Sequence, residues 1–205
     1  MSAEEDPVDE AADDVLDDDP WRGWTLGEDG LWHRSGARVL LLSGEPAGDP
    51  GAVRILLVRG HDVDDPQRSW WFTVGGGIDA GESPLEAAVR EVAEETGLVL
   101  PPASVVGPVL QRSAVFDFFA RTCRQEELLY LAWLEPGQEE LALSSAGWTA
   151  VERASVDELR WWRLDDLAAA EAAGAEVFPE GLAGLVADLV PGWDGVLRAL
   201  GEGRG

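Results

Sequence analysis

Residues 76–98 read GGIDAGESPLEAAVREVAEETGL, and this stretch decides how the chain folds around it. Ser83 suits the N-cap of a helix, Pro84 suits the first helical position, and Glu86 completes a Ser-x-x-Glu capping box. Gly97 fits the C′ position, where the backbone needs a left-handed conformation. The stretch therefore predicts a glycine-rich turn that leads directly into a capped helix.

The predicted helix, from Pro84 to Thr96, separates an apolar face from an acidic face. At roughly 100° per residue, the side chains that share the apolar face are Leu85, Val89, Val92 and Thr96. Glu91, Glu94 and Glu95 gather on the opposite side, because spacings of three and four make helical neighbours. Three like charges on one stripe repel by about 0.2–0.5 kcal/mol per close pair. A divalent cation would convert this repulsion into coordination, and magnesium prefers such hard oxygen ligands.

Three consecutive glycines, Gly75, Gly76 and Gly77, stand before the helix. Because they carry no Cβ, the backbone can come close to a ligand at these positions. We expect the three glycines to contact the substrate, and we assign the Gly76 carbonyl as a further metal ligand.

Read in order, the segment is Gly, five residues, Glu, seven residues, then Arg-Glu-apolar-any-Glu-Glu-any-Gly-apolar. Every fixed position of the Nudix signature is filled, so the chain resembles the Nudix hydrolases. The resemblance covers roughly Leu31 to Ala173 and implies an α/β fold, a Nudix-type α/β/α sandwich with a mixed central sheet. It also implies a metal-dependent hydrolase that cleaves a pyrophosphate bond in a nucleoside diphosphate linked to another group. The cofactor implied is Mg²⁺, with Mn²⁺ as a substitute.

The resemblance also assigns roles to individual residues. Glu91, Glu94 and Glu95 match the family's metal ligands and count among the catalytic residues. Arg90 is expected to orient these glutamates by charge-assisted hydrogen bonds. Glu82 is expected to stabilise the junction of loop and helix instead of binding the metal.

Two questions stay open. Glu91 is the first candidate for the general base, but in other Nudix enzymes the base lies on a loop outside this segment, where Glu126 and Glu127 are candidates. The function is also open to alternatives, namely a non-catalytic Nudix-fold nucleotide sensor or an acidic cation-binding protein. An intact set of box carboxylates argues against the sensor.

A nucleoside substrate needs a stacking surface and contacts for its phosphates. Besides the three glycines, we assign Arg59, Trp71 and Glu127 to substrate binding. Other rings that fit a stacking role are Trp70, Phe116, Phe118, Phe119, Trp161 and Trp162, and other arginines that fit a phosphate role are Arg112, Arg121 and Arg124. The leaving group stays undetermined among ADP-ribose, dinucleoside polyphosphates, oxidised nucleoside triphosphates and sugar nucleotides.

The composition of the chain bears on its partners and on its cellular location. The net charge is −25, so no basic footprint exists for a nucleic-acid polymer. The single cysteine, Cys123, excludes an intramolecular disulfide and agrees with a cytoplasmic location. The sequence contains no run of roughly 18 apolar residues, so no membrane span is predicted, and no signal peptide is evident. The expected partner is a small-molecule nucleotide, and a homodimer is one option for the oligomeric state.

Three segments follow one another along the chain. Residues 1–20 are rich in Asp and Glu and lack a basic residue, which predicts disorder. Residues 21–173 form the Nudix-like domain, and residues 174–205 are expected to be a C-terminal helical extension packed on it. Strands are predicted at 38–42, 53–58, 69–74, 105–111, 114–120, 128–134, 152–153 and 160–163, and helices at 165–173 and 182–189.

Overall fold

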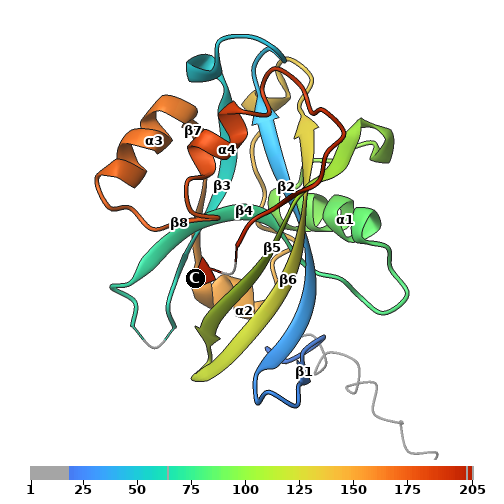
Figure 1. The fold of residues 1–205 in the computed structure, drawn as a ribbon, viewed down its shortest axis with the longest axis vertical. Coiled ribbons are helices and arrows are strands. Elements are labelled where there is room, and N and C mark those ends of the chain that lie inside the picture. The colour runs from blue at the N-terminus through green and yellow to red at the C-terminus, as the bar shows by residue number, and fades with distance from the viewer. Residues whose placement is uncertain (1–18, 64, 202, 205) are drawn as a thin grey trace, which may run out of the picture.

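A computed structural model describes residues 19–63, 65–201 and 203–204 of the chain (Figure 1). The acidic segment 1–20, for which we predict disorder, lies outside the described residues except for Asp19 and Pro20. No helix in the described part of the chain is both long and apolar enough to cross a membrane.

Strand β2 (Trp32–Ser43) lies at the centre of a mixed sheet, between two groups of strands. On one side, β2 runs parallel to β6 (Arg121–Trp133), which forms an antiparallel hairpin with β5 (Val105–Phe118). On the other side lie β3 (Arg54–His61), β4 (Ser69–Gly77) and β7 (Val156–Arg163), which are antiparallel to β2 or to one another where they pair. Shorter strands are β1 (Thr25–Leu26), β8 (Val177–Phe178), β9 (Arg198–Ala199) and β10 (Gly203–Arg204).

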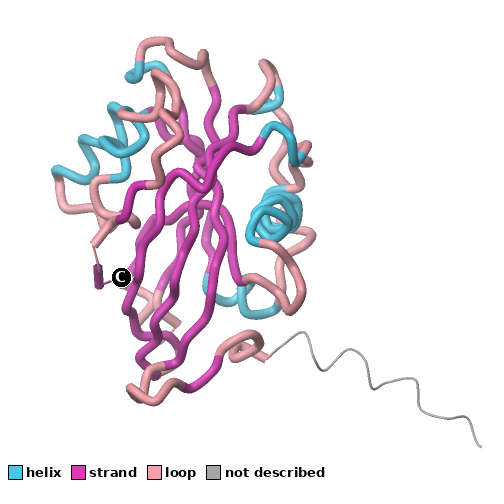
Figure 2. Tube along the Cα trace, turned by 45° about the vertical axis from the view of Figure 1, so that its right-hand side comes forward, coloured by secondary structure: helices cyan, strands magenta, loops and turns pink. Residues whose placement is uncertain are grey.

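Helices cover both faces of the sheet (Figures 1 and 2). The helices are α1 (Pro84–Thr96), α2 (Ala150–Ser155), α3 (Leu164–Ala172) and α4 (Leu182–Ala187), with 3₁₀ turns at Pro50–Ala52, Pro102–Ser104 and Gln138–Glu140. Side chains of β2 alternate between the two faces. Leu40 and Leu42 pack in one core with α3 and α4, whereas Val39 and Leu41 pack in a second core with α1. The expected α/β/α sandwich with a mixed sheet is confirmed.

Two local predictions are wrong. Gly75, Gly76 and Gly77 do not form a turn; they are the last residues of β4 and pair with β2. Residues 152–153 are not a strand but part of α2, because the Thr149 side chain caps this helix in a capping box with Glu152.

Two other segments differ from the expected secondary structure. The strands predicted at 105–111 and 114–120 form one strand, β5, with an irregularity in its pairing between Val106 and Leu110. Residues 174–205 contain α4, but also β8, β9 and β10, so this segment is not helical throughout. Its helix does pack on the sheet, because Leu182 and Val186 are fully buried in the core with α3.

Candidate active site

Helix α1 carries the acidic residues and is held firmly at both ends. The Ser83 side chain accepts a hydrogen bond from the Glu86 N–H at 3.3 Å, and the Ser83 N–H donates to the Glu86 carboxylate at 2.8 Å. Gly97 ends the helix with a φ of 75°, as the sequence predicts. On the inner face Ala88 and Val92 are fully buried against the sheet. The opposite edge of the helix is therefore presented in a fixed position.

Arg90 connects the helix to the end of β4. Its Nε and Nη2 donate to the two carboxylate oxygens of Glu82 at 2.9 and 3.0 Å. Its Nη1 donates to Glu91 at 2.8 Å and to Glu94 at 2.9 Å, and Nη2 also donates to the Gly77 carbonyl at 2.9 Å. Hydrogen bonds and the negative charge of these glutamates raise the pKa of Arg90. One guanidinium thus positions three carboxylates; two of them, Glu91 and Glu94, are among those that the resemblance assigns to Arg90, and the third is Glu82 instead of Glu95.

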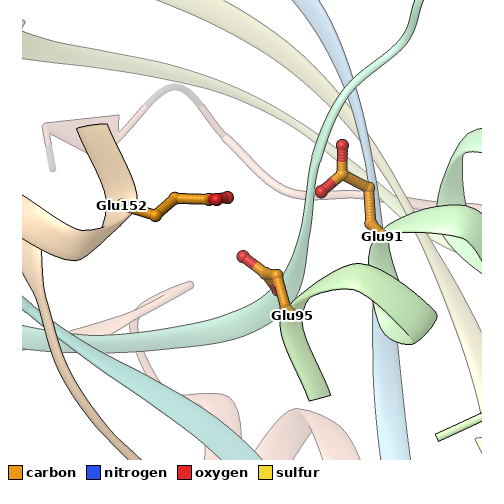
Figure 3. Close-up of side chains that lie close together, drawn as sticks. All are labelled: Glu91, Glu95 and Glu152. Atoms are coloured by element: carbon orange, nitrogen blue, oxygen red, sulfur yellow. The ribbon is translucent and has the colours of Figure 1, made fainter. Parts of the chain in front are cut away.

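Glu91 and Glu95 meet a third carboxylate, that of Glu152, which comes from α2 (Figure 3). One ligand oxygen from each side chain lies within 4.8 Å of the others. Burial raises the pKa of Glu91, and burial together with the charge of Glu91 raises that of Glu95 well above its ordinary value. Like charges in a poorly hydrated place are unfavourable unless a cation compensates them. The three oxygens therefore fit a divalent cation such as Mg²⁺.

The segment before α2 explains how Glu152 reaches this place. The Trp148 indole N–H donates to the Glu95 carbonyl at 2.9 Å, which ties the segment to α1. Gly147 lies so close that an added Cβ would be 2.5 Å from the Glu94 carbonyl oxygen. Thr149 then caps α2, and its N–H donates to Glu152 at 2.7 Å. Sequence reasoning missed Glu152, although the Thr-x-x-Glu pattern from Thr149 to Glu152 signals a helix start at this point.

Glu94 lies outside this three-carboxylate cluster, whereas Gly75 and Gly76 contact its members directly. The Glu94 side chain is 49% exposed and pairs with Arg90. An added Cβ at Gly76 would lie 2.7 Å from the Glu91 carboxylate, so the absence of a side chain at Gly76 makes room for Glu91. Gly75 has a φ of 133°, and its N–H donates to Glu95 at 2.8 Å.

The two other candidates for the general base, Glu126 and Glu127, lie in strand β6 and not on a loop, and they do not join the cluster. Burial raises the pKa of Glu127, but the charges of Arg38 and Arg112 outweigh this effect and lower it to about 2. Arg38 Nε donates to one Glu127 oxygen at 2.5 Å, and Arg112 Nε donates to the other. Glu126 is exposed and accepts a hydrogen bond from the Ser113 hydroxyl at 2.6 Å. A carboxylate held ionised by two arginines is a poor proton acceptor near neutral pH.

A cavity of about 480 Å³ opens beside the carboxylates, between α1, the ends of β2 and β4, and the tip of the β5–β6 hairpin. Several predicted residues line it: Gly75, Gly76, Gly77, Trp70, Glu91, Glu94, Glu95, Arg112, Phe116, Phe118, Phe119 and Glu127. Its wall also includes Trp24, Arg34, Arg38, Gln125 and Glu152, none of which we assign to the site from the sequence. At the hairpin tip Phe119 and Ala120 have positive φ values of 46° and 55°.

Other predicted substrate residues lie away from this cavity. Arg59 pairs with Asp157 and Glu158 at 3.8 and 3.7 Å. Trp71 packs edge-to-face on Trp162 with ring centroids 5.1 Å apart, in the core with α3 and α4. The remaining candidates outside the cavity wall are Arg121, Arg124 and Trp161.

Comparisons with known proteins agree on the type of domain. A family model described as NUDIX domain matches residues 32–181. A putative 8-oxo-dGTP diphosphatase of Bacillus subtilis is 37% identical over 116 residues, which cover 52% of this chain and 69% of that protein. An RNA pyrophosphohydrolase of Brucella anthropi is 46% identical over 52 residues, which cover 25% of this chain and 29% of that protein. The crystal structure of a MutT protein from Bacillus halodurans superposes with a TM-score of 0.50 at 19% identity, covering 82% of this chain and 89% of that one.

Proposed function

The chain belongs to the Nudix family, whose members act on pyrophosphate bonds of nucleotides, and we propose that it is a metal-dependent hydrolase of a nucleoside diphosphate linked to another group. The observation that carries this proposal is the meeting of Glu91, Glu95 and Glu152 beside a cavity of nucleotide size. The intact Nudix box and the ordered network around Arg90 support catalysis over simple binding.

Glu91, Glu95 and Glu152 would hold the cation, with Mg²⁺ as the preferred ion and Mn²⁺ as a substitute. When bound, a divalent cation neutralises phosphate oxygens and lowers the pKa of an attacking water. Glu94 also accepts a hydrogen bond from Arg90, as Glu91 does, and it lies on the more exposed side of the cluster. It is the third of the metal ligands that the family pattern assigns, after Glu91 and Glu95.

Glu152 is the carboxylate best suited to accept the proton of the attacking water. Glu91 is neutralised by Arg90, whose Nη1 lies 2.8 Å from it, and Glu95 accepts the Gly75 N–H. The hydrogen bonds of Glu152 come from the neutral N–H and hydroxyl groups of Thr149. The ion pair with Arg90 lowers the pKa of Glu91 against the larger effect of burial, whereas none of the hydrogen bonds recorded for Glu152 comes from a charged group. We therefore prefer Glu152, in helix α2 outside the box, to Glu91 as the candidate general base.

A substrate panel tests the proposal. Purified protein with Mg²⁺ is offered ADP-ribose, dinucleoside polyphosphates, oxidised nucleoside triphosphates, sugar nucleotides and RNA with a 5′-triphosphate, and the phosphate products are separated and quantified. The net charge of −25 favours the small nucleotides over RNA.

Variants separate the roles of the carboxylates. We expect Glu95→Gln to abolish Mg²⁺-dependent turnover and to weaken Mg²⁺ binding. Glu152→Gln should also weaken Mg²⁺ binding, because Glu152 is one of the three proposed ligands, and at saturating Mg²⁺ it should still lower kcat by about 10²–10⁴-fold, the usual range for a general base. Glu126→Gln, at an exposed position outside the cavity wall, is the matched control and should retain turnover. Nucleotide binding without any turnover by the wild-type protein would instead identify a sensor.

A further inference from the structure

Arg34, on β2, is a cavity-lining arginine without a carboxylate partner among the described residues. Its Nε and Nη2 both donate to Oε1 of Gln125, at 3.2 and 2.8 Å, and this acceptor is neutral. Two further arginines of the cavity wall, Arg38 and Arg112, share the carboxylate of Glu127. Three guanidinium groups therefore face one carboxylate on this side of the cavity.

The surroundings of Arg34 disfavour its own charge. Burial and the neighbouring charge of Arg38 lower the pKa of Arg34 to about 10, so the guanidinium is still protonated at neutral pH. Glu91 acts in the opposite direction by its negative charge. An added Cβ at Gly76 would lie 2.7 Å from the Glu91 carboxylate, and one at Gly77 would lie 3.1 Å from Cδ of Arg34. Because adjacent residues of a strand face opposite sides, Arg34 and Glu91 lie on opposite sides of the end of β4.

Binding of a divalent cation would change the electrostatic environment of the Arg34 guanidinium. Glu91, Glu95 and Glu152 would hold a divalent ion, and this ion would offset the negative charge of Glu91 that stabilises the Arg34 guanidinium. The guanidinium then lies in a partly buried place with only an amide oxygen as its hydrogen-bond acceptor among the described residues. A buried charge is stabilised when a partner of opposite charge joins it. An anionic group of the bound ligand is a suitable partner of opposite charge for the Arg34 guanidinium.

Trp24 holds the guanidinium in position. Cζ of Arg34 lies 4.6 Å from the centre of the Trp24 ring, a cation–π contact. Trp24 is only 7% exposed and also stacks on Phe118, with centroids 6.2 Å apart. Its ring is therefore covered by protein and does not serve as a platform for a base. Its contribution is to fix Arg34 at the side of the cavity beyond the carboxylates.

We propose that Arg34 is a specificity-determining residue that binds a further phosphoryl group of the substrate, beyond the pyrophosphate held at the carboxylate cluster. This inference rests on the proposed function, because it takes the cluster as the place of the pyrophosphate. In this role Arg34 favours nucleoside triphosphates and dinucleoside polyphosphates over nucleoside diphosphate sugars, because the linked group of a sugar nucleotide carries no charge to pair with Arg34.

Binding of two non-hydrolysable nucleotides tests the inference without any turnover. The probes are α,β-methylene-ADP and the α,β;β,γ-bismethylene analogue of ATP, titrated by calorimetry in the presence of Mg²⁺. Wild-type protein should bind the triphosphate analogue about tenfold or more tightly than the diphosphate analogue, the range of a charge-assisted hydrogen bond. Arg34→Gln should reduce this preference to near unity, with little change for the diphosphate. Arg34→Lys, which keeps the charge, should retain part of it.

Arg121→Gln is the matched control, because Arg121 also stacks on tryptophan, at 4.2 Å from the Trp21 ring centre, but lies outside the cavity wall. This variant should keep the wild-type preference. An Arg34→Gln protein that keeps the preference, or that loses both ligands equally, overturns the inference, as does a wild-type protein that binds both analogues alike. Absence of turnover on the substrate panel overturns the proposed function instead and leaves this binding ratio readable.

Discussion

Replacing Glu127 by Gln removes the carboxylate that two arginines share in the cavity wall. Although burial raises the pKa of Glu127, Arg38 and Arg112 lower it from 4.5 to about 2. This difference corresponds to roughly 3 kcal/mol, since each pKa unit is worth about 1.4 kcal/mol. Breaking a buried ion pair costs a similar amount, about 3–5 kcal/mol, because the remaining charge is left unpaired. We therefore expect Glu127→Gln to lower the free energy of unfolding at pH 7 by about 3 kcal/mol.

The pH dependence of this loss is a second signature of the Glu127 ion pair. The pKa of Glu127 is lower in the folded than in the unfolded protein, so its stabilisation is complete above the unfolded value and is lost as the pH falls toward 2. The gap between wild type and variant should shrink to less than about half by pH 3. Urea unfolding followed by tryptophan fluorescence measures it, with Glu126→Gln expected within about 0.5 kcal/mol of wild type. A loss below about 1 kcal/mol at pH 7, or one that stays constant down to pH 3, would refute the reasoning.

Two further predictions concern the carboxylate cluster. Burial and the charge of Glu91 raise the pKa of Glu95, so ionised Glu95 destabilises the folded protein above the pKa that Glu95 has in the unfolded chain. We therefore expect Glu95→Gln to raise the Tm in EDTA at pH 7. The same variant should reduce the further rise in Tm that Mg²⁺ causes. Thermal unfolding with and without Mg²⁺ checks this, and a lower Tm in EDTA would contradict it. Gly76→Ala should lower kcat/KM at least about tenfold, because its Cβ would lie 2.7 Å from the Glu91 carboxylate and displace it. Gly184→Ala, where no atom lies within 4 Å of the added Cβ, is the control for that assay.

The sequence alone predicts the helix of the box and its surroundings well, because the signals there are local. A capping box, a C-terminal glycine and helical spacing depend on residues within a few positions of one another, so α1 was placed residue by residue. The contacts of Arg90 with Glu91 and Glu94 follow the role that the family resemblance assigns to it, whereas its ion pair with Glu82 is not among the predictions.

Residues brought to the site from a distance were not predicted. Glu152 reaches the cluster only because the segment around Trp148 docks on α1, and no local pattern announces that contact. Arg34 and Gln125 are adjacent because β2 and β6 run parallel in one register, in which Arg34 lies opposite Gln125. The composition of the glycine run favours a turn, whereas pairing with β2 makes these residues part of β4.

The two ends of the cavity come from different parts of the fold. One end belongs to α1 and β4, in the middle of the core, while the other belongs to residues 19–24 and to the hairpin tip around Phe118 and Phe119. Strands that meet in the core tolerate few substitutions, whereas a hairpin tip accepts changes of sequence and length. Changes of sequence at the hairpin tip can therefore alter which ligands the cavity accepts without disturbing the carboxylate cluster. For protein engineering, the same division makes the β5–β6 tip the segment to randomise when a new substrate is sought.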